Sequence, residues 1–173
     1  MDQPMDLAAV YLASARGTFA KYREMAEGAF RQVDDAQFFA APDGGSNSIA
    51  VIVKHVAGNM RSRWTDFLTT DGEKPDRDRD GEFESEGDHR AALMEAWNAG
   101  WTLAFGELDR LAAEDLTRTV HIRAEPHTVV QAIDRQVTHA AYHVGQIVYL
   151  AKHFAGDAWQ TLSIPRKQSQ PVK

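Results

Sequence analysis

The stretch QVTHAAYHVGQ, residues 136–146, places two histidines four residues apart inside a long helical pattern. On an α-helix, positions i and i+4 lie one turn apart on the same face, so His139 and His143 can direct their rings at one ion. Neutral imidazoles are common ligands of transition metals, and a third ligand would have to come from another segment. His55 is the best candidate because it also lies inside a strong helical pattern.

The orientation of these histidines leaves two alternatives open. On a helical wheel, His139, His143 and His55 lie away from the centres of their apolar stripes. They either face solvent or line a groove where their two helices meet. The residue after His139 is Ala140, so the pair is not the HExxH motif of zinc metalloproteases. His89, His121 and His127 are expected on the surface, and His153 is left out of the site because it lies on another face of its helix than His143.

Apolar residues recur at spacings of three and four in four long segments. They predict helices over residues 5–34, 48–69, 88–112 and 128–154, with Gly156 ending the last one. Residues 38–45 contain Pro and paired Gly and predict a loop. Residues 116–123 alternate in polarity, but a single strand cannot form a sheet, so irregular extended chain is expected. The sequence therefore predicts an all-α four-helix bundle.

The connection between the second and third helices is long and highly charged. Residues 71–88 hold nine acids and three bases, which accounts for the whole formal net charge of −6. We expect an extended surface connection whose charges keep it soluble, with Phe83 as its one apolar contact to the body. Links in bundles usually span ~2–8 residues, and a longer one permits the helices it joins to run parallel.

Composition excludes several classes of function. The 173 residues fit one domain, 1–173, and the absence of Cys excludes disulfides, cysteine–zinc sites and cysteine nucleophiles. An acidic N-terminal segment without the features of a signal peptide, together with the lack of Cys, favours a cytoplasmic location. No run approaches the ~20 apolar residues that span a membrane. The neutral remainder of the chain offers no basic stripe for nucleic acid.

Two stretches carry a family resemblance. Residues 54–74 (KHVAGNMRSRWTDFLTTDGEK) and 139–147 (HAAYHVGQI) resemble the DUF1572 subgroup of the DinB/YfiT-like superfamily, and the likeness extends to residues 162–165. The resemblance implies an up-down-down-up bundle, often a homodimer, with a divalent metal held by His55, His139 and His143. It also implies transferase or isomerase chemistry with a low-molecular-weight thiol, such as bacillithiol or mycothiol, and an electrophilic small molecule.

Two functional hypotheses follow. In the first, the protein is an enzyme whose bound metal activates a thiol or water. Zinc and nickel are the preferred metals, and iron and copper are the alternatives. Asn59 and Gln146, one turn from the ligands, could then orient the substrate or bound water, or could be ordinary polar packing; no catalytic residue or general base is identified. In the second, a metal-stabilised or metal-free bundle acts through dimerisation or partner binding, without catalysis.

Overall fold

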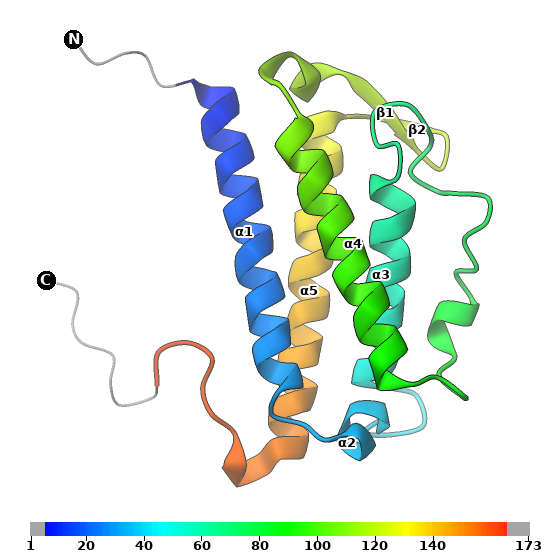
Figure 1. Ribbon diagram of the computed structural model, residues 1–173, viewed down its shortest axis with the longest axis vertical. Coiled ribbons are helices and arrows are strands. Elements are labelled where there is room, and N and C mark those ends of the chain that lie inside the picture. The colour runs from blue at the N-terminus through cyan, green and yellow to red at the C-terminus, as the bar shows by residue number, and fades with distance from the viewer. Residues whose placement is uncertain (1–5, 166–173) are drawn as a thin grey trace, which may run out of the picture.

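The computed structural model describes residues 6–165, and within them the chain forms five α-helices and one two-stranded hairpin (Figure 1). The helices are α1 (Leu7–Phe30), α2 (Asp35–Phe39), α3 (Ile49–Trp64), α4 (Arg90–Arg110) and α5 (Val129–Ala155). The strands are β1 (Thr119–Ile122) and β2 (Glu125–Thr128). The four predicted long helices are confirmed as α1, α3, α4 and α5. Residue 5, the expected first residue of the first helix, lies outside the described part.

The four long helices pack side by side in a bundle. In Figure 1, α1 and α5 run downward and are neighbours, while α3 and α4 both run upward. The long connection after α3 returns the chain to the lower end, which allows α3 and α4 to be parallel. The two helices approach closely at Gly100, where an added Cβ would lie 3.2 Å from Met60.

Aromatic side chains fill the centre of the bundle. Phe19 of α1 meets Trp64 of α3 and Trp101 of α4, with ring centroids 6.1 and 5.9 Å apart in edge-on geometry. Trp97 packs against Trp101 at 5.5 Å, and all four side chains are buried. Edge-on aromatic pairs add ~0.5–1.5 kcal/mol each beyond the burial of their area. This centre fixes how α1, α3 and α4 are placed relative to one another.

Two helix ends differ from the prediction. The first helix stops at Phe30, and the expected loop at residues 38–45 begins instead with the last two residues of α2. Asp34 and Gln37 form a capping box that starts α2 and buries Phe38. The second predicted helix ends at Trp64, five residues early. Beyond it Asp66 has a positive φ of 49°, a conformation that a continuing helix cannot adopt.

The hairpin corrects the expectation of irregular chain over residues 116–123. Thr119 pairs with Thr128 and Ile122 with Glu125 in an antiparallel register. The turn residues Arg123 and Ala124 both have positive φ, 56° and 62°, as the favoured two-residue hairpin turns require. Neither is the Gly or Asn usual there, so the turn is strained. Asp71 from another segment accepts hydrogen bonds from both of their backbone N–H groups, at 2.9 and 2.7 Å.

The charged connection, residues 71–88, does not lie fully extended on the surface, which corrects the expectation of an extended surface connection. Ser62 and Gly72 are joined by a 2.8 Å hydrogen bond, and the Gly72 N–H donates to the His121 carbonyl at 2.8 Å. A 3₁₀ turn, Gly81–Phe83, brings Glu82 inside, where its side chain is only 7% exposed. Phe83, the expected apolar contact, remains 39% exposed. The connection therefore folds back onto α3 and contributes a buried carboxylate.

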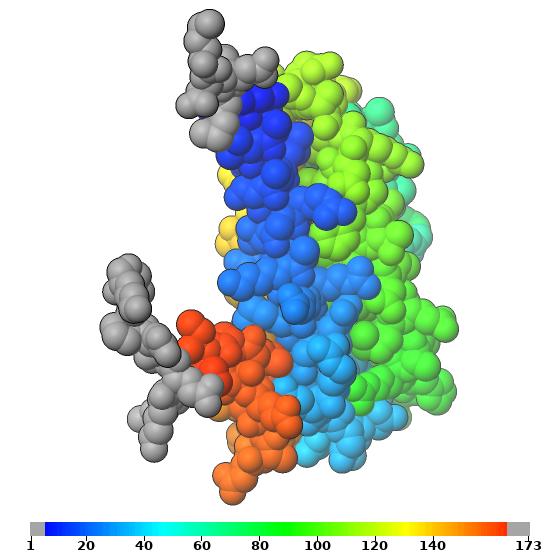
Figure 2. Space-filling view, turned by 60° about the vertical axis from the view of Figure 1, so that its left-hand side comes forward, coloured from blue at the N-terminus to red at the C-terminus, as the bar shows by residue number. Residues whose placement is uncertain are grey.

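The segment after α5 returns to the lower end of α1. Figure 2 shows it lying against α1. Gln32 exchanges two hydrogen bonds with the backbone of Gln160, at 3.0 and 2.6 Å, and Leu162 lies over Gly28. The sequence also predicts that the chain leaves the body of the protein at residues 165–167, of which residues 166 and 167 lie outside the described part. Among residues 6–165, no helix is long and apolar enough to cross a membrane.

Candidate metal centre

The structure brings the three predicted histidines together between α3 and α5. His55 is 7% and His143 is 8% exposed, and His139 is partly buried beside them. The Nε2 atoms of His55 and His139 are 3.2 Å apart. The ring of His143 lies 4.9 Å from that of His55 and 4.6 Å from that of His139, centroid to centroid. Of the two alternatives, the groove between helices is confirmed and the solvent-facing arrangement is wrong.

The separation of the ring nitrogens suits metal ligation. Two nitrogens that each bind a tetrahedral zinc ion at ~2.0–2.1 Å lie ~3.4 Å apart, close to the 3.2 Å observed for His55 and His139. One nitrogen from each of the three rings lies within 4.8 Å of the others. The three side chains could therefore hold a metal through neutral nitrogen donors.

A carboxylate holds His55 in place. The Nδ1 of His55 donates to Glu82 Oε2 at 2.9 Å, which leaves the Nε2 lone pair directed at His139. Arg77 donates two hydrogen bonds of 2.7 Å to the same carboxylate, and the Arg77 side chain is 4% exposed. Burial alone would raise the pKa of Glu82, but the hydrogen bonds from Arg77 and His55 outweigh it and lower the pKa below its usual value. Carboxylates in this position orient a ligating histidine and increase its basicity.

The approach of Glu82 requires a glycine on α3. A Cβ added at Gly58 would lie 2.2 Å from Glu82 Oε1 and 2.8 Å from its carboxyl carbon. Gly58 is three residues after His55, so it lies on the same side of the helix. Glycine in a helix interior costs ~1 kcal/mol relative to alanine. Here that cost gives the carboxylate room to reach the histidine.

Gln146 has the corresponding role for His143. The Nδ1 of His143 donates to Gln146 Oε1 at 2.8 Å, so the Nε2 of this ring carries the lone pair. That Nε2 is buried and has no hydrogen-bond partner among the described residues. A buried polar atom without a partner costs ~1–3 kcal/mol unless a ligand satisfies it. Gln146, predicted to orient substrate or bound water or to be ordinary polar packing, has the ring of His143 as its hydrogen-bond partner.

Burial also keeps these rings free of protons. It lowers the pKa of His139 to about 3, and the neighbouring rings of His143 and His55 act in the same direction. Burial likewise lowers the pKa of His143 to about 4, although the hydrogen bond with Gln146 opposes the shift. Both rings are therefore neutral at pH 7, the state in which imidazole binds a metal.

A cavity of about 330 Å³ opens beside His139. Asn59 and Gln136 form its inner side, where the Gln136 amide donates to Asn59 Oδ1 at 3.0 Å and joins α3 to α5. Asn59, predicted to touch substrate or water or to be ordinary packing, does pack, and it also lines this cavity. The other lining side chains are Arg63, Arg135, Thr138, His139 and Tyr142. His139 is therefore accessible from a space large enough for a small molecule, and His55 and His143 lie buried behind it.

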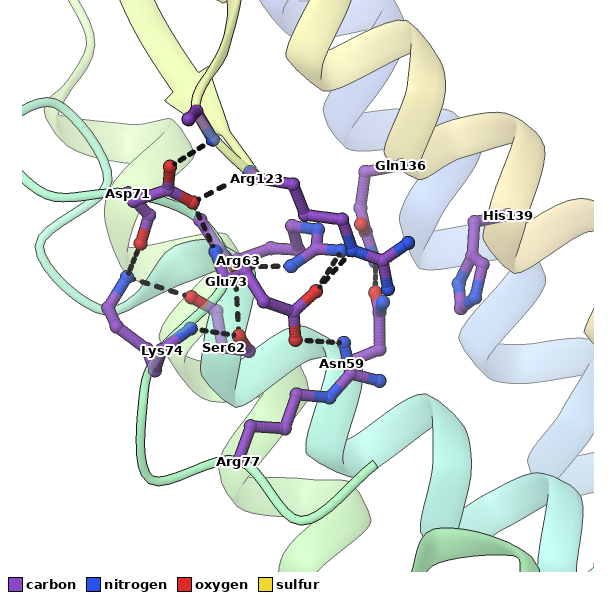
Figure 3. A network of polar contacts seen from close by, with 12 residues as sticks. Asn59, Ser62, Arg63, Asp71, Glu73, Lys74, Arg77, Arg123, Gln136 and His139 are labelled. Atoms are coloured by element: carbon purple, nitrogen blue, oxygen red, sulfur yellow. Dashed lines mark hydrogen bonds and ion pairs between the residues drawn. The ribbon is translucent and has the colours of Figure 1, made fainter. Parts of the chain in front are cut away.

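Three guanidinium groups surround one carboxylate (Figure 3), and one of them, that of Arg63, lines this cavity. Glu73 accepts from Arg63 at 3.1 Å, from Arg77 at 3.2 Å and from Arg123 at 2.9 Å. We call Arg63, Arg77 and Arg123 the arginine cluster. Gln136 and His139 lie on adjacent turns of α5 in the same view. The cluster joins α3, the charged connection and the hairpin at one end of the candidate site.

Sequence reasoning missed Glu82, Arg77 and the arginine cluster. Periodicity could not find them because the connection has no regular pattern, and nothing distinguishes Glu82 from the other acids there except its neighbour Phe83. The ring of Phe83 lies 5.0 Å from that of His55 and covers it. The other four histidines of the chain are absent from the three-histidine group found among residues 6–165.

A comparison with known protein families identifies the family to which the chain belongs. It matches the family described as a protein of unknown function, DUF1572, over residues 6–168, and it belongs to that family. The resemblance carried by residues 54–74 and 139–147 is thereby confirmed. A search of curated proteins finds no match to this chain.

Proposed function

We propose that this DUF1572 protein binds one divalent transition metal at His55, His139 and His143 and is a metal-dependent enzyme of the transferase or isomerase type. Its reactants would be a small thiol, or water, and an electrophilic small molecule. Zinc and nickel suit three imidazoles, and iron and copper are the alternatives. The hydrogen bonds of the ring nitrogens carry this proposal.

The hydrogen-bond partners of the histidine ring nitrogens support the proposal. Glu82 and Gln146 occupy the Nδ1 positions of His55 and His143, so the lone pair of each ring lies on Nε2, and that of His143 has no hydrogen-bond partner among the described residues. The Nε2 of His139 is 3.2 Å from that of His55. Neutral rings fixed by outer hydrogen bonds are the usual state of metal-ligating histidines. Three protein ligands, rather than four, are typical of catalytic zinc sites.

A metal bound there would supply Lewis acidity, lowering the pKa of a thiol or water so that its anion can attack. The chain's own residues have supporting tasks. Glu82, held by Arg77, fixes the orientation of the His55 ring. Asn59 and Gln136 hold α3 and α5 at the separation that the histidines need. Phe83 and Tyr142 lie against the rings of His55 and His143 and restrict the access of water from those sides.

Metal binding by the protein without an affinity tag tests the first part of the proposal. We expect the wild type to bind one equivalent of zinc, and His143→Ala to bind at least ~100-fold more weakly because a ligand is lost. His153→Ala is the matched control, since His153 is exposed on the same helix outside the group. Equal affinity in wild type and His143→Ala would show that the histidines do not form a metal site.

A second function is favoured by one observation: the ligands come from two helices, so a metal would also join α3 to α5. A non-enzymatic bundle stabilised by metal would then act through dimerisation or partner binding. Turnover distinguishes the two functions. In the enzyme, consumption of thiol and electrophile rises with metal content and is lost in His143→Ala. In the structural protein, metal raises the melting temperature and no turnover appears.

The remaining expectations are proposals of the same kind. Membership of the DinB/YfiT-like superfamily agrees with parallel α3 and α4 and the long connection between them. A homodimer is expected from the resemblance, and sedimentation equilibrium of the metal-loaded protein would show it as twice the chain mass of 19.3 kDa. A cytoplasmic location is proposed on the lack of Cys.

A further inference from the structure

We infer that the cavity beside His139 is a subsite for an anionic group of the substrate, a carboxylate or a phosphate, and that Arg135 is its main partner. The inference rests on the proposed function, since it assigns a substrate class to the same site. It follows from the charges around the cavity, from the side chains that line it, and from its distance to the histidines.

The charge around the site is unbalanced toward positive. Three carboxylates lie among four guanidinium groups, and each carboxylate already accepts hydrogen bonds from the protein. The carboxylates are Asp71, Glu73 and Glu82, and the guanidinium groups are those of the arginine cluster and Arg135. The guanidinium without a carboxylate partner is that of Arg135, which is exposed, and a divalent ion on three neutral imidazoles would add two positive charges. An anion that reaches the cavity can therefore form a charge-assisted hydrogen bond without displacing a carboxylate of the protein.

Arg135 is the cation that is available to a ligand. It makes no ion pair with any of residues 6–165, whereas each arginine of the cluster is paired. Asp134, the acid beside it on α5, accepts a 2.7 Å hydrogen bond from Tyr11 instead. None of the described residues that line the cavity is acidic. A guanidinium with free donors is well suited to a carboxylate or phosphate.

A larger space does not fit this role. A groove of about 610 Å³ lies between α3, α4 and the charged connection, but its lining includes none of the three histidines. Its charged side chains are of both signs, with Asp66, Asp76 and Asp78 among them. Glu82 and Arg77 border this groove, and their mutual ion pair separates it from His55. The smaller cavity is the one that offers both positive charge and a candidate ligand.

The spacing on α5 sets the size of the ligand. Arg135 and His139 are four residues apart, which places their Cβ atoms ~5–6 Å from each other on one face. A substrate that presents a thiol or another donor at the histidines can therefore place an anionic group several bonds away against Arg135. The cavity volume of about 330 Å³ admits a molecule of that length and limits it to a small one.

The test uses cobalt(II) in place of the native metal, because a bound thiolate gives cobalt a strong near-ultraviolet absorption that needs no enzyme assay. The probes are 6-mercaptohexanoate and 6-mercapto-1-hexanol, which have equal length and differ in charge. Both are too long to close a small chelate ring on the metal. The dissociation constants of the two probes are measured for wild type, Arg135→Gln and Lys152→Gln. Lys152 is an exposed cation on the same helix, ~25 Å further along.

We expect the wild type to bind the carboxylate thiol about tenfold more tightly than the alcohol, the effect of one charge-assisted hydrogen bond. Lys152→Gln should keep this preference, and Arg135→Gln should reduce it to within about twofold. Equal affinities in the wild type, or a tenfold preference that persists in Arg135→Gln, would overturn the inference while leaving the metal site intact. Failure of the wild type to bind cobalt at the histidines would overturn the proposed function and this inference together.

Discussion

The substitution Gly58→Ala tests whether the carboxylate of Glu82 is locked beside His55. The three heavy atoms nearest to the new methyl group all belong to the side chain of Glu82. A glutamate end group could normally swing away from such a contact at little cost. Here it accepts two hydrogen bonds from Arg77 and one from His55 in a buried place, so it cannot move without losing them.

The magnitude follows from the distances. The added Cβ would lie 2.2 Å from Glu82 Oε1, so the carboxylate has to move by roughly 1.3 Å to reach an ordinary contact distance. Hydrogen bonds of 2.7 Å then lengthen to about 4 Å and are lost. Breaking a buried ion pair costs about 3–5 kcal/mol. Replacing glycine by alanine inside a helix returns about 1 kcal/mol. We expect a net loss of about 2–4 kcal/mol, with metal binding 10- to 100-fold weaker.

Urea unfolding of the metal-free protein and competitive zinc titration measure the two effects. Gly106→Ala is the matched control, because it lies on the exposed side of α4 with nothing within 4 Å of the new Cβ. It should stabilise the protein by up to about 1 kcal/mol and leave metal affinity unchanged. If Gly58→Ala were as stable as Gly106→Ala and bound zinc like the wild type, the locked carboxylate would be refuted.

Three further outcomes are expected. Because burial lowers the pKa of His139 to about 3 and that of His143 to about 4, from 6.5, the unfolded chain takes up protons first as the pH falls. The metal-free protein should therefore lose stability below pH 6.5, and each of the two histidines should contribute up to about 1.4 kcal/mol per pH unit. An unfolding free energy that stays constant between pH 7 and 5 would contradict this. Glu82→Gln keeps the shape but removes the charge, so zinc affinity in competitive titration should fall at least about tenfold; an unchanged affinity would mean that His55 needs no carboxylate. Ala124→Gly relieves a positive φ of 62° and should raise the unfolding free energy by about 0.5–1 kcal/mol in urea, whereas a loss would show that the turn is unstrained.

The helices and the histidines were predictable because both depend on local spacing. Apolar residues every three or four positions mark α1, α3, α4 and α5, and His139 and His143 share a face whatever the rest of the chain does. The pairing with His55 rested on its place in another helical pattern and on the family resemblance. The helix α2 was missed although its signal, Asp34 with Gln37 three residues later, is a visible capping box.

The hairpin and the buried carboxylate depend on contacts between distant segments, which no local pattern records. Residues 123 and 124 lack the Gly or Asn of a usual turn, and Asp71, more than fifty residues earlier, supplies the hydrogen bonds that hold them. Glu82 is one of nine acids in residues 71–88, and its place over Gly58 and beside His55 exists only in the folded chain. Both features form when the charged connection folds back onto α3.

The metal content of the protein expressed without a histidine tag, in wild type and His139→Ala, tests the central claim most directly. Elemental analysis after removal and re-addition of zinc should find about one equivalent per chain in the wild type. Less than about a tenth of an equivalent should remain in His139→Ala, because the loss of one of three ligands opens the site. Equal zinc content in the two proteins, or none in the wild type, would contradict a metal centre at these three histidines.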